Sequence, residues 1–289
     1  MKMKYGFFAA CSLAACVLYL SACGGKEKKP ASDATEAPVQ EVNRNIKFES
    51  YTFDMIGELP DSLGIEGVDN SRYVRIQGEG VLPADLGEAD IRMLRDSLMS
   101  LAGMQFSEED MPVPVPTLGM KITDLPPAST DACGYISNTL SASLVNPRVI
   151  VFQNEREAYA CMAAHGNSAV SYLNYFVPEG RIIHLRDLMK ANYQEALAKI
   201  VREKVKEAGI SLSCDLSEVG IPDQFAISSS GITFSWDPYE IAPYCEGVVT
   251  VEVTAGDLME AGLLSKEGEY TLTGREPQIP APDSADSGK

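Results

Sequence analysis

The chain has 289 residues, and its 41 acidic side chains outnumber 24 basic ones, giving a net charge of −17 at pH 7. An acidic surface of this kind is repelled by phosphate backbones and anionic lipid headgroups, which argues against a nucleic-acid partner. A cationic partner suits the charge better, although a solvated acidic surface with no partner is the more common explanation of such a charge.

The first 23 residues have the pattern of a secretory signal. Two lysines precede an apolar run from Tyr5 to Leu20 that is short for a membrane span, and a small-residue cleavage site follows. Leu20-Ser21-Ala22-Cys23 resembles the lipobox of bacterial lipoproteins, so we expect Cys23 to be lipidated and to anchor the protein to a membrane through its acyl chains. The alternative is an ordinary signal cut near Ala22, with Cys23 left as a free thiol.

The predicted location is the bacterial cell envelope. Gly24 after the lipidated cysteine resembles the sorting pattern of outer-membrane lipoproteins, on either the periplasmic or the surface face. Residues 24–45 and 275–289 are rich in Pro, Ser, Ala and charge, which predicts a disordered tether and a disordered tail. The folded body between them is expected in two parts, residues 46–149 and 150–274.

In the first part, β-branched and aromatic residues predict strands at 46–55 and 71–82. Residues 88–103 place leucines and Ile91 on one helical face and stop at Gly103, which predicts an amphipathic helix packed on a sheet. The proline-rich stretch 108–127 is expected to be extended or irregular.

In the second part, strands are predicted at 148–155 and 168–180, with a turn at Pro178-Glu179-Gly180 leading into 181–185. Residues 192–209 form the strongest predicted helix, with Asn192 as N-cap, Glu195 completing a capping box and Gly209 at the C-cap. Further strand patterns follow at 224–236 and 246–262. The fold class is therefore α+β, with antiparallel strands and packed helices.

Four cysteines remain in the mature body, and an envelope compartment permits disulfides. None of them has the C-x-x-C spacing of a zinc site, so we expect no metal and no cofactor. One or two disulfides and buried free thiols are both compatible with the pattern. The four candidates are Cys133, Cys161, Cys214 and Cys245.

The sequence holds no nucleophile elbow, phosphate-binding loop or H-E-x-x-H motif. His165 precedes Gly166, which suggests positive φ or a close backbone approach and favours a structural histidine; a general base or ligand would need a partner that the sequence does not display. His184 is expected to pack at a strand end. Five polar and aromatic residues lie close together near the end of the body: Asp237, Tyr239, Glu240, Tyr244 and Glu246. This cluster suits a capped loop better than acid-base chemistry or cation binding.

Several motifs in order resemble a known extracytoplasmic domain of unknown function. They are Ala164-His165-Gly166, a strand with Asn174 and Tyr175, Leu185-Arg186-Asp187-Leu188, a capped helix, and "GITFSWDPYEIAPYCEG", which contains Tyr239, Glu240 and Gly247. This domain ends the lysozyme-sensing anti-sigma factor RsiV and lies beside the catalytic domain of the peptidoglycan deacetylase PdaC. The match covers about residues 150–260.

The resemblance implies an α+β receptor-like or binding module, here without the sigma-binding part or the deacetylase domain of those relatives. Met162-Ala163 replaces the glycines of the family's histidine turn, which favours a fold-determining role for His165. The leading hypothesis is a non-enzymatic lipoprotein that binds a cationic protein, for example lysozyme, or a cell-wall glycan. Two alternatives are a cell-wall hydrolase or deacetylase using His165 with the Asp237/Glu240 loop, and a scaffold with an exposed apolar patch.

Overall fold

The computed structural model describes residues 46–68, 70–86, 90–124 and 131–275. The signal, Cys23, the tether and nearly all of the tail lie outside the described residues. All described residues belong to one compact unit, Val42–Lys289, which contains both hydrophobic cores.

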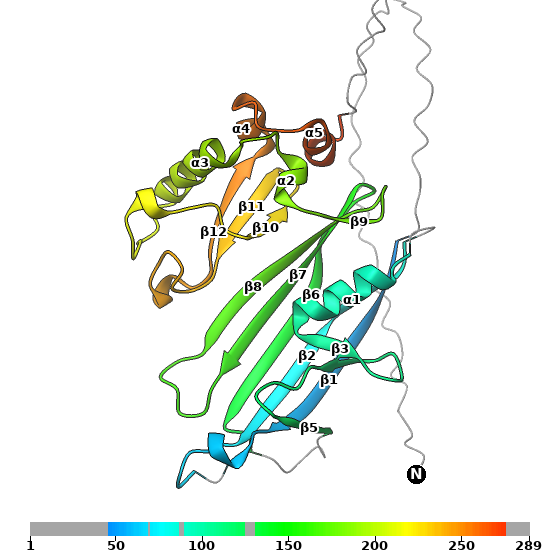
Figure 1. Ribbon diagram of the computed structural model, residues 1–289, viewed down its shortest axis with the longest axis vertical. Helices are drawn as coiled ribbons and strands as arrows, with labels where there is room; N and C mark the ends of the chain where they lie inside the picture. The colour runs from blue at the N-terminus through cyan, green and yellow to red at the C-terminus, as the bar shows by residue number, and fades with distance from the viewer. Residues whose placement is uncertain (1–45, 69, 87–89, 125–130, 276–289) are drawn as a thin grey trace, which may run out of the picture. The chain divides into compact units, whose positions relative to one another are not determined.

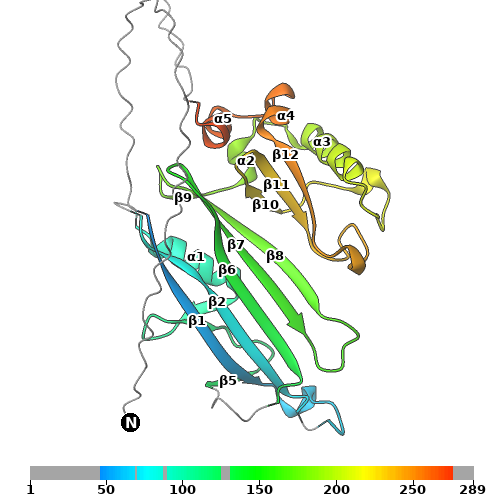
Figure 2. The same ribbon diagram turned by 180° about the vertical axis from the view of Figure 1, so that it is seen from behind.

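A seven-stranded sheet runs through the body (Figures 1 and 2). Only the central β2–β6 pair is parallel, and every other neighbouring pair is antiparallel. In sheet order the strands are β5 (Lys121–Asp124), β1 (Lys47–Glu58), β2 (Tyr73–Asp85), β6 (Gly134–Val145), β7 (Val149–Tyr159), β8 (Asn167–Phe176) and β9 (Arg181–Ile183).

The first part of strand β7, residues 149–152, is buried on both faces of this sheet, because successive side chains of a strand point to opposite sides. Ile150 and Phe152 enter one core, and Val149 and Val151 enter the other. Two-sided burial explains why "VIVF" is a continuous apolar run with no alternation. The two cores therefore share this strand.

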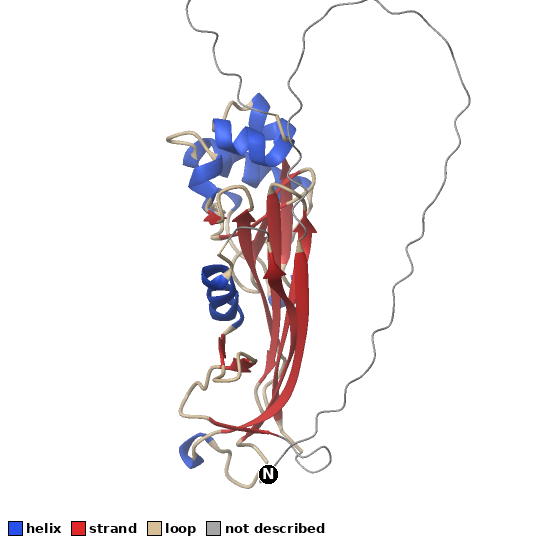
Figure 3. Ribbon diagram, turned by 90° about the vertical axis from the view of Figure 1, so that its right-hand side faces the viewer, coloured by secondary structure: helices blue, strands red, loops and turns tan. Residues whose placement is uncertain are grey.

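Helix α1 (Arg92–Ala102) covers one face of the sheet, as the edge-on view shows (Figure 3). Leu94 and Leu98 are fully buried beneath it, and Gly103 ends the helix in the left-handed conformation with φ +67°. The segment after it forms the two-stranded β3 (Met104–Phe106) and β4 (Pro112–Pro114). The short helix η1 (Asp61–Leu63) joins β1 to β2.

The second core lies under a three-stranded antiparallel sheet and helix α3. The strands are β10 (Gln224–Ile227), β11 (Gly231–Trp236) and β12 (Val249–Thr254). The helices are α2 (Leu185–Leu188), α3 (Gln194–Glu207), α4 (Ala255–Glu260) and α5 (Lys266–Thr273), with short helices η2 (Leu216–Glu218) and η3 (Tyr244–Glu246). This arrangement confirms the predicted α+β class with antiparallel-rich sheets.

Two local expectations are wrong. Asn192 has φ +61° and lies before the N-cap residue Tyr193, so it makes no capping box with Glu195. Asparagine tolerates this left-handed conformation, which serves here to turn the chain into the helix. Residues 246–262 are only half strand: Thr254 ends β12 and caps α4, its Oγ1 accepting from the Asp257 N–H at 3.0 Å.

One disulfide among the described residues links the ends of the neighbouring strands β6 and β7. Cys133 at the start of β6 bonds Cys161 in the loop between β7 and β8. Cys214 and Cys245 are free thiols, Cys245 exposed and Cys214 half-buried, so neither forms a disulfide in the structure. The expected division at residue 149 coincides with the first residue of β7, inside the seven-stranded sheet.

Candidate functional site

The loop 160–166 presents His165 to solvent. The Cys133–Cys161 disulfide holds one side of the loop, and Met162 has φ +62° with a 70% exposed side chain. His165 Nδ1 lies 2.8 Å from the Gly166 carbonyl oxygen, which can only accept, so Nδ1 carries the proton. The other ring nitrogen, Nε2, lies 3.1 Å from the Tyr239 hydroxyl oxygen, within hydrogen-bonding distance.

Three rings gather at this point from two segments that are far apart in the chain. The His165 ring stacks on Tyr244 with centroids 4.0 Å apart and an interplanar angle of 26°. Tyr239 lies 5.8 Å from Tyr244 and is 60% exposed. His165, Tyr239 and Tyr244 are hereafter the His165 cluster. Offset ring pairs at such separations stabilise each other beyond simple burial.

The Asp237–Glu240 turn holds Tyr239 in an unusual conformation. Tyr239 has φ +74°, which is costly for a bulky side chain and is found where surrounding contacts enforce it. Asp237 Oδ1 accepts from the Val170 N–H at 3.0 Å, and Glu240 Oε2 accepts from the Asp237 N–H at 2.7 Å. Both carboxylates of the proposed acid-base loop are thus bound to backbone, and they fix the turn that displays Tyr239.

The remaining residues of the histidine and aromatic motifs act through the backbone. A Cβ on Gly166 would lie 3.2 Å from the Ala158 carbonyl oxygen, so the close approach expected there is present. Gly247 has φ +67° and ψ −147° after η3, a region that glycine alone adopts readily. Ala164 is exposed beside His165.

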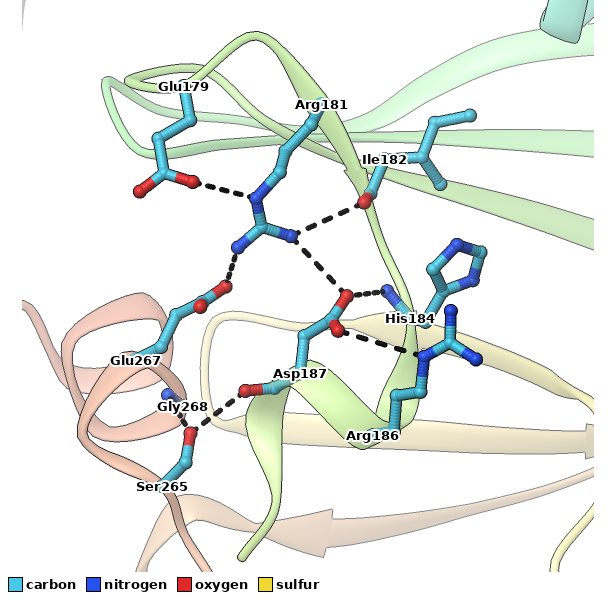
Figure 4. Close-up of polar contacts among 9 residues, drawn as sticks. All are labelled: Glu179, Arg181, Ile182, His184, Arg186, Asp187, Ser265, Glu267 and Gly268. Atoms are coloured by element: carbon cyan, nitrogen blue, oxygen red, sulfur yellow. Dashed lines mark hydrogen bonds and ion pairs between the residues drawn. The ribbon is translucent and has the colours of Figure 1, made fainter.

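Asp187 belongs to a different polar network, between β9, α2 and α5 (Figure 4). Its Oδ2 accepts from the His184 N–H at 2.8 Å and lies 3.4 Å from Arg181 Nη1, and its backbone carbonyl accepts from Ser265 Oγ at 2.8 Å. Arg181 also contacts Glu179, at 2.7 Å, and Glu267 on α5. The hydrogen bond to Glu179, and then that to Glu267, raises the pKa of Arg181.

This network connects the β8–β9 hairpin and α2 to α5. Its residues make no contact with the His165 cluster among the interactions of the described residues. Asp187 is therefore a structural residue of the motif. The ring of His184 is exposed, so the expectation that it packs at the strand end is wrong; its backbone caps α2 instead.

Sequence reasoning singled out His165, Tyr239 and Glu240, and the structure brings the first two together. It did not predict that Tyr244 stacks on His165 or that the Met162 side chain is exposed in the same loop. Tyr244 occurs in the recognised motif, but only the stacking distance shows that it faces His165. Across the described ranges, no group of three His, Cys, Asp or Glu side chains is arranged to hold a metal ion.

Comparison with known proteins identifies the class to which this fold belongs. Residues 186–255 match the family model described as a protein of unknown function, DUF3298. A DUF3298 family member from Bacteroides fragilis superposes with a TM-score of 0.55 at 15% identity, covering 80% of this chain and 99% of its own. A DUF3298 family protein from Pseudomonas aeruginosa gives 0.51 at 11% identity, covering 77% and 95%.

The chain thus carries a DUF3298 domain, and the expected domain of unknown function is confirmed. At these identities the two structures establish a shared fold. No curated protein matches the sequence. Among the described residues, no helix is long and apolar enough to cross a membrane.

Proposed function

We propose that this protein is a lipid-anchored lipoprotein of the bacterial envelope that binds a ligand without catalysing a reaction. Lipidated Cys23 holds it to the membrane, on the outer membrane where there are two, and the His165 cluster is the centre of the ligand-binding surface. The single observation that carries the proposal is Tyr239, a 60% exposed aromatic residue fixed at φ +74°. Strain of this kind collects at functional positions, where it holds a side chain in place before the ligand arrives.

The favoured ligand is a cationic protein. Tyrosine is enriched where protein partners bury a surface, since its ring adds contact area at little entropic cost. Exposed Glu240 and Glu246 flank the rings, and the whole chain carries −17. A positively charged partner would therefore be attracted over a distance and then held by the rings.

The test is binding of lysozyme, the cationic ligand of the resembling sensor, to the unit beginning at Val42. We expect a saturable complex that weakens as ionic strength rises. Tyr239→Ala should weaken it at least tenfold, while the matched change Tyr73→Ala on β2 leaves it unchanged. Absence of any salt-sensitive complex with lysozyme or with a cationic protein from envelope extract would refute the choice of partner.

A cell-wall glycan is the second candidate ligand, since exposed rings offer flat apolar faces as well. Pull-down on purified cell wall distinguishes it: retention that ignores salt but is lost in Tyr239→Ala supports the glycan.

The enzymatic alternative requires His165 to work with a carboxylate. Among the contacts of described residues, none joins His165 to Glu240, and Glu240 is engaged with the Asp237 N–H. Release of products from cell-wall fragments over time, abolished by His165→Ala, would restore the hydrolase or deacetylase reading.

A further inference from the structure

A second surface feature lies on the opposite half of the body. A cleft of about 590 Å³ opens between α1, the β3–β4 segment and the long sheet. This volume falls within the range of small-molecule binding sites. The side chains of Met99, Met104 and Met120 form an apolar part of its lining, called here the methionine wall. Methionine side chains are flexible and polarisable, so they adapt to apolar ligands of different shape.

The floor of the cleft carries an unsatisfied polar group. Asn138 on β6 is only 4% exposed, and its Oδ1 has no hydrogen-bond partner among the described residues. Buried polar atoms are almost always paired, and an exception calls for an explanation. This oxygen is itself shielded from solvent, so a ligand N–H would supply the missing partner once the flexible methionine side chains that line the cleft move aside.

Two opposite charges also line the cleft. Arg156 lies directly across from Asn138 in the β6–β7 register, so their side chains share one face of the sheet. Asp96 lies on α1 with Met99, Ser100 and Gly103, three, four and seven positions on, which is one helical face. Among the described residues, no ion pair within 4.0 Å includes Arg156 or Asp96, although the charge of Asp96, after that of Asp90, helps to raise the pKa of Arg92.

We propose that this cleft binds a short apolar peptide. Its apolar side chains lie on the methionine wall, a peptide N–H donates to Asn138 Oδ1, its carboxylate pairs with Arg156 and its ammonium group with Asp96. The combination of both charges, a buried amide acceptor and an apolar wall matches a zwitterionic peptide more completely than a fatty acid, which lacks the donor and the cation. The site is separate from the His165 cluster and is independent of the function proposed for it.

The probe is the tripeptide Ala-Leu-Leu, titrated calorimetrically into the unit beginning at Val42. We expect saturable binding at one site. Arg156→Gln should weaken binding at least tenfold, and Arg186→Gln, a change of an exposed arginine that does not line the cleft, should leave it unchanged. Asp96→Asn should weaken the free tripeptide severalfold but have no effect on its N-acetylated form, which lacks the ammonium group.

The sharpest variant is Asn138→Leu. It removes an unpaired buried oxygen, so it should raise the thermal midpoint while abolishing peptide binding, a pattern that loss of fold cannot produce. Asn154→Leu is the matched control, because Asn154 on β7 is also buried with an unpaired Oδ1 but does not line the cleft. It should keep full peptide affinity.

No saturable binding by the unmodified protein, or binding indifferent to both Arg156→Gln and Asn138→Leu, would overturn the proposal. Equal affinity for the peptide capped at both ends would do the same, since it assigns no role to the two charges. Lysozyme binding, measured on the same variants, should not change, which separates this site from the His165 cluster.

Discussion

Asn174 shows how a single side chain joins the two sheets. It is 2% exposed on β8, its Nδ2 donates to the Phe225 carbonyl at 2.9 Å, and its Oδ1 accepts from the Ile227 N–H at 2.8 Å. The amide thus completes β10 in the way that a neighbouring strand would. Asn174→Ala leaves one buried and one partly buried backbone group unpaired and should lower the free energy of unfolding by about 2–4 kcal/mol.

Urea denaturation checks this expectation. The control is Asn167→Ala at the exposed start of β8, which should change stability by less than about 0.5 kcal/mol. A similar small loss for Asn174→Ala would mean that water replaces the amide and that the bridge contributes little.

The contribution of Asp257 to the stability of the fold depends on pH. The Thr254 hydroxyl, the Thr254 N–H and Lys204 lower the pKa of its carboxyl below the ordinary value, with the hydroxyl hydrogen bond first among the causes. A depressed folded-state pKa contributes stability above the unfolded-state pKa, near 4, which is lost as pH falls through the folded value. Asp257→Ala should therefore be less stable than the unmodified protein at pH 7 by about 1 kcal/mol, the usual cost of a lost cap.

This difference should shrink as the pH falls below about 4, where the unfolded chain takes up the proton first, and it should reach its lowest value only below the depressed folded-state pKa. Thermal unfolding of both proteins across this range measures it, with exposed Asp223→Ala as the control. A difference that stays constant down to the lowest pH at which the protein folds would show that the carboxylate charge is not involved.

At the scale of elements, the sequence predicted the helices and strands whose signals are local, that is, carried by the residues of the element itself. The apolar face of α1 and Gly103 at its end are local features, and so is the Gly209 stop of α3. The strand β6 was overlooked, because serines and Asn138 interrupt its alternation where one face meets solvent or the cleft. Helix α5 was also missed, since Gly268 and threonines make it a weak helix former.

The reason for Gly268 appears only in three dimensions. A Cβ there would lie 2.0 Å from the Leu188 carbonyl oxygen, so α5 packs on α2 through a residue that weakens the helix itself.

The candidate site was likewise only partly predictable from the sequence. The sequence motif contained His165, Tyr239 and Tyr244, but their stacking depends on β8, the disulfide and the Asp237 turn meeting in space.

Cysteine substitutions test what the Cys133–Cys161 disulfide contributes to these elements. It closes a loop of 28 residues and restricts the unfolded chain, so Cys133→Ser with Cys161→Ser should lower the free energy of unfolding by about 3–4 kcal/mol. Because the bond holds the loop that carries His165, partner binding through the His165 cluster should weaken as well. Cys245→Ser, a change of an exposed free thiol, should alter neither stability nor binding.

At the scale of the whole molecule, the cores are coupled through the long sheet. β7 contributes Ile150 and Phe152 to one core and Val149 and Val151 to the other, and the free edge of β8 is covered by side chains of the second sheet. Asp237 and Gln224 accept from the Val170 and Tyr172 N–H groups, which protects an edge that would otherwise pair with another chain.

Shared strands predict one cooperative unfolding transition in place of two. Leu98 in α1 and Leu197 in α3 are both fully buried, each in a different core, and either Leu→Ala change should cost about 2–5 kcal/mol. The single tryptophan, Trp236, lies in the core that contains Leu197 and reports on that core alone. If the cores unfold together, Leu98→Ala must shift the tryptophan fluorescence transition as far as the circular dichroism transition, although Leu98 lies in the other core. Exposed Met93→Ala on the same helix should shift neither. A fluorescence transition that stays in place while circular dichroism splits into two steps would establish two independent domains, with the division at the start of β7.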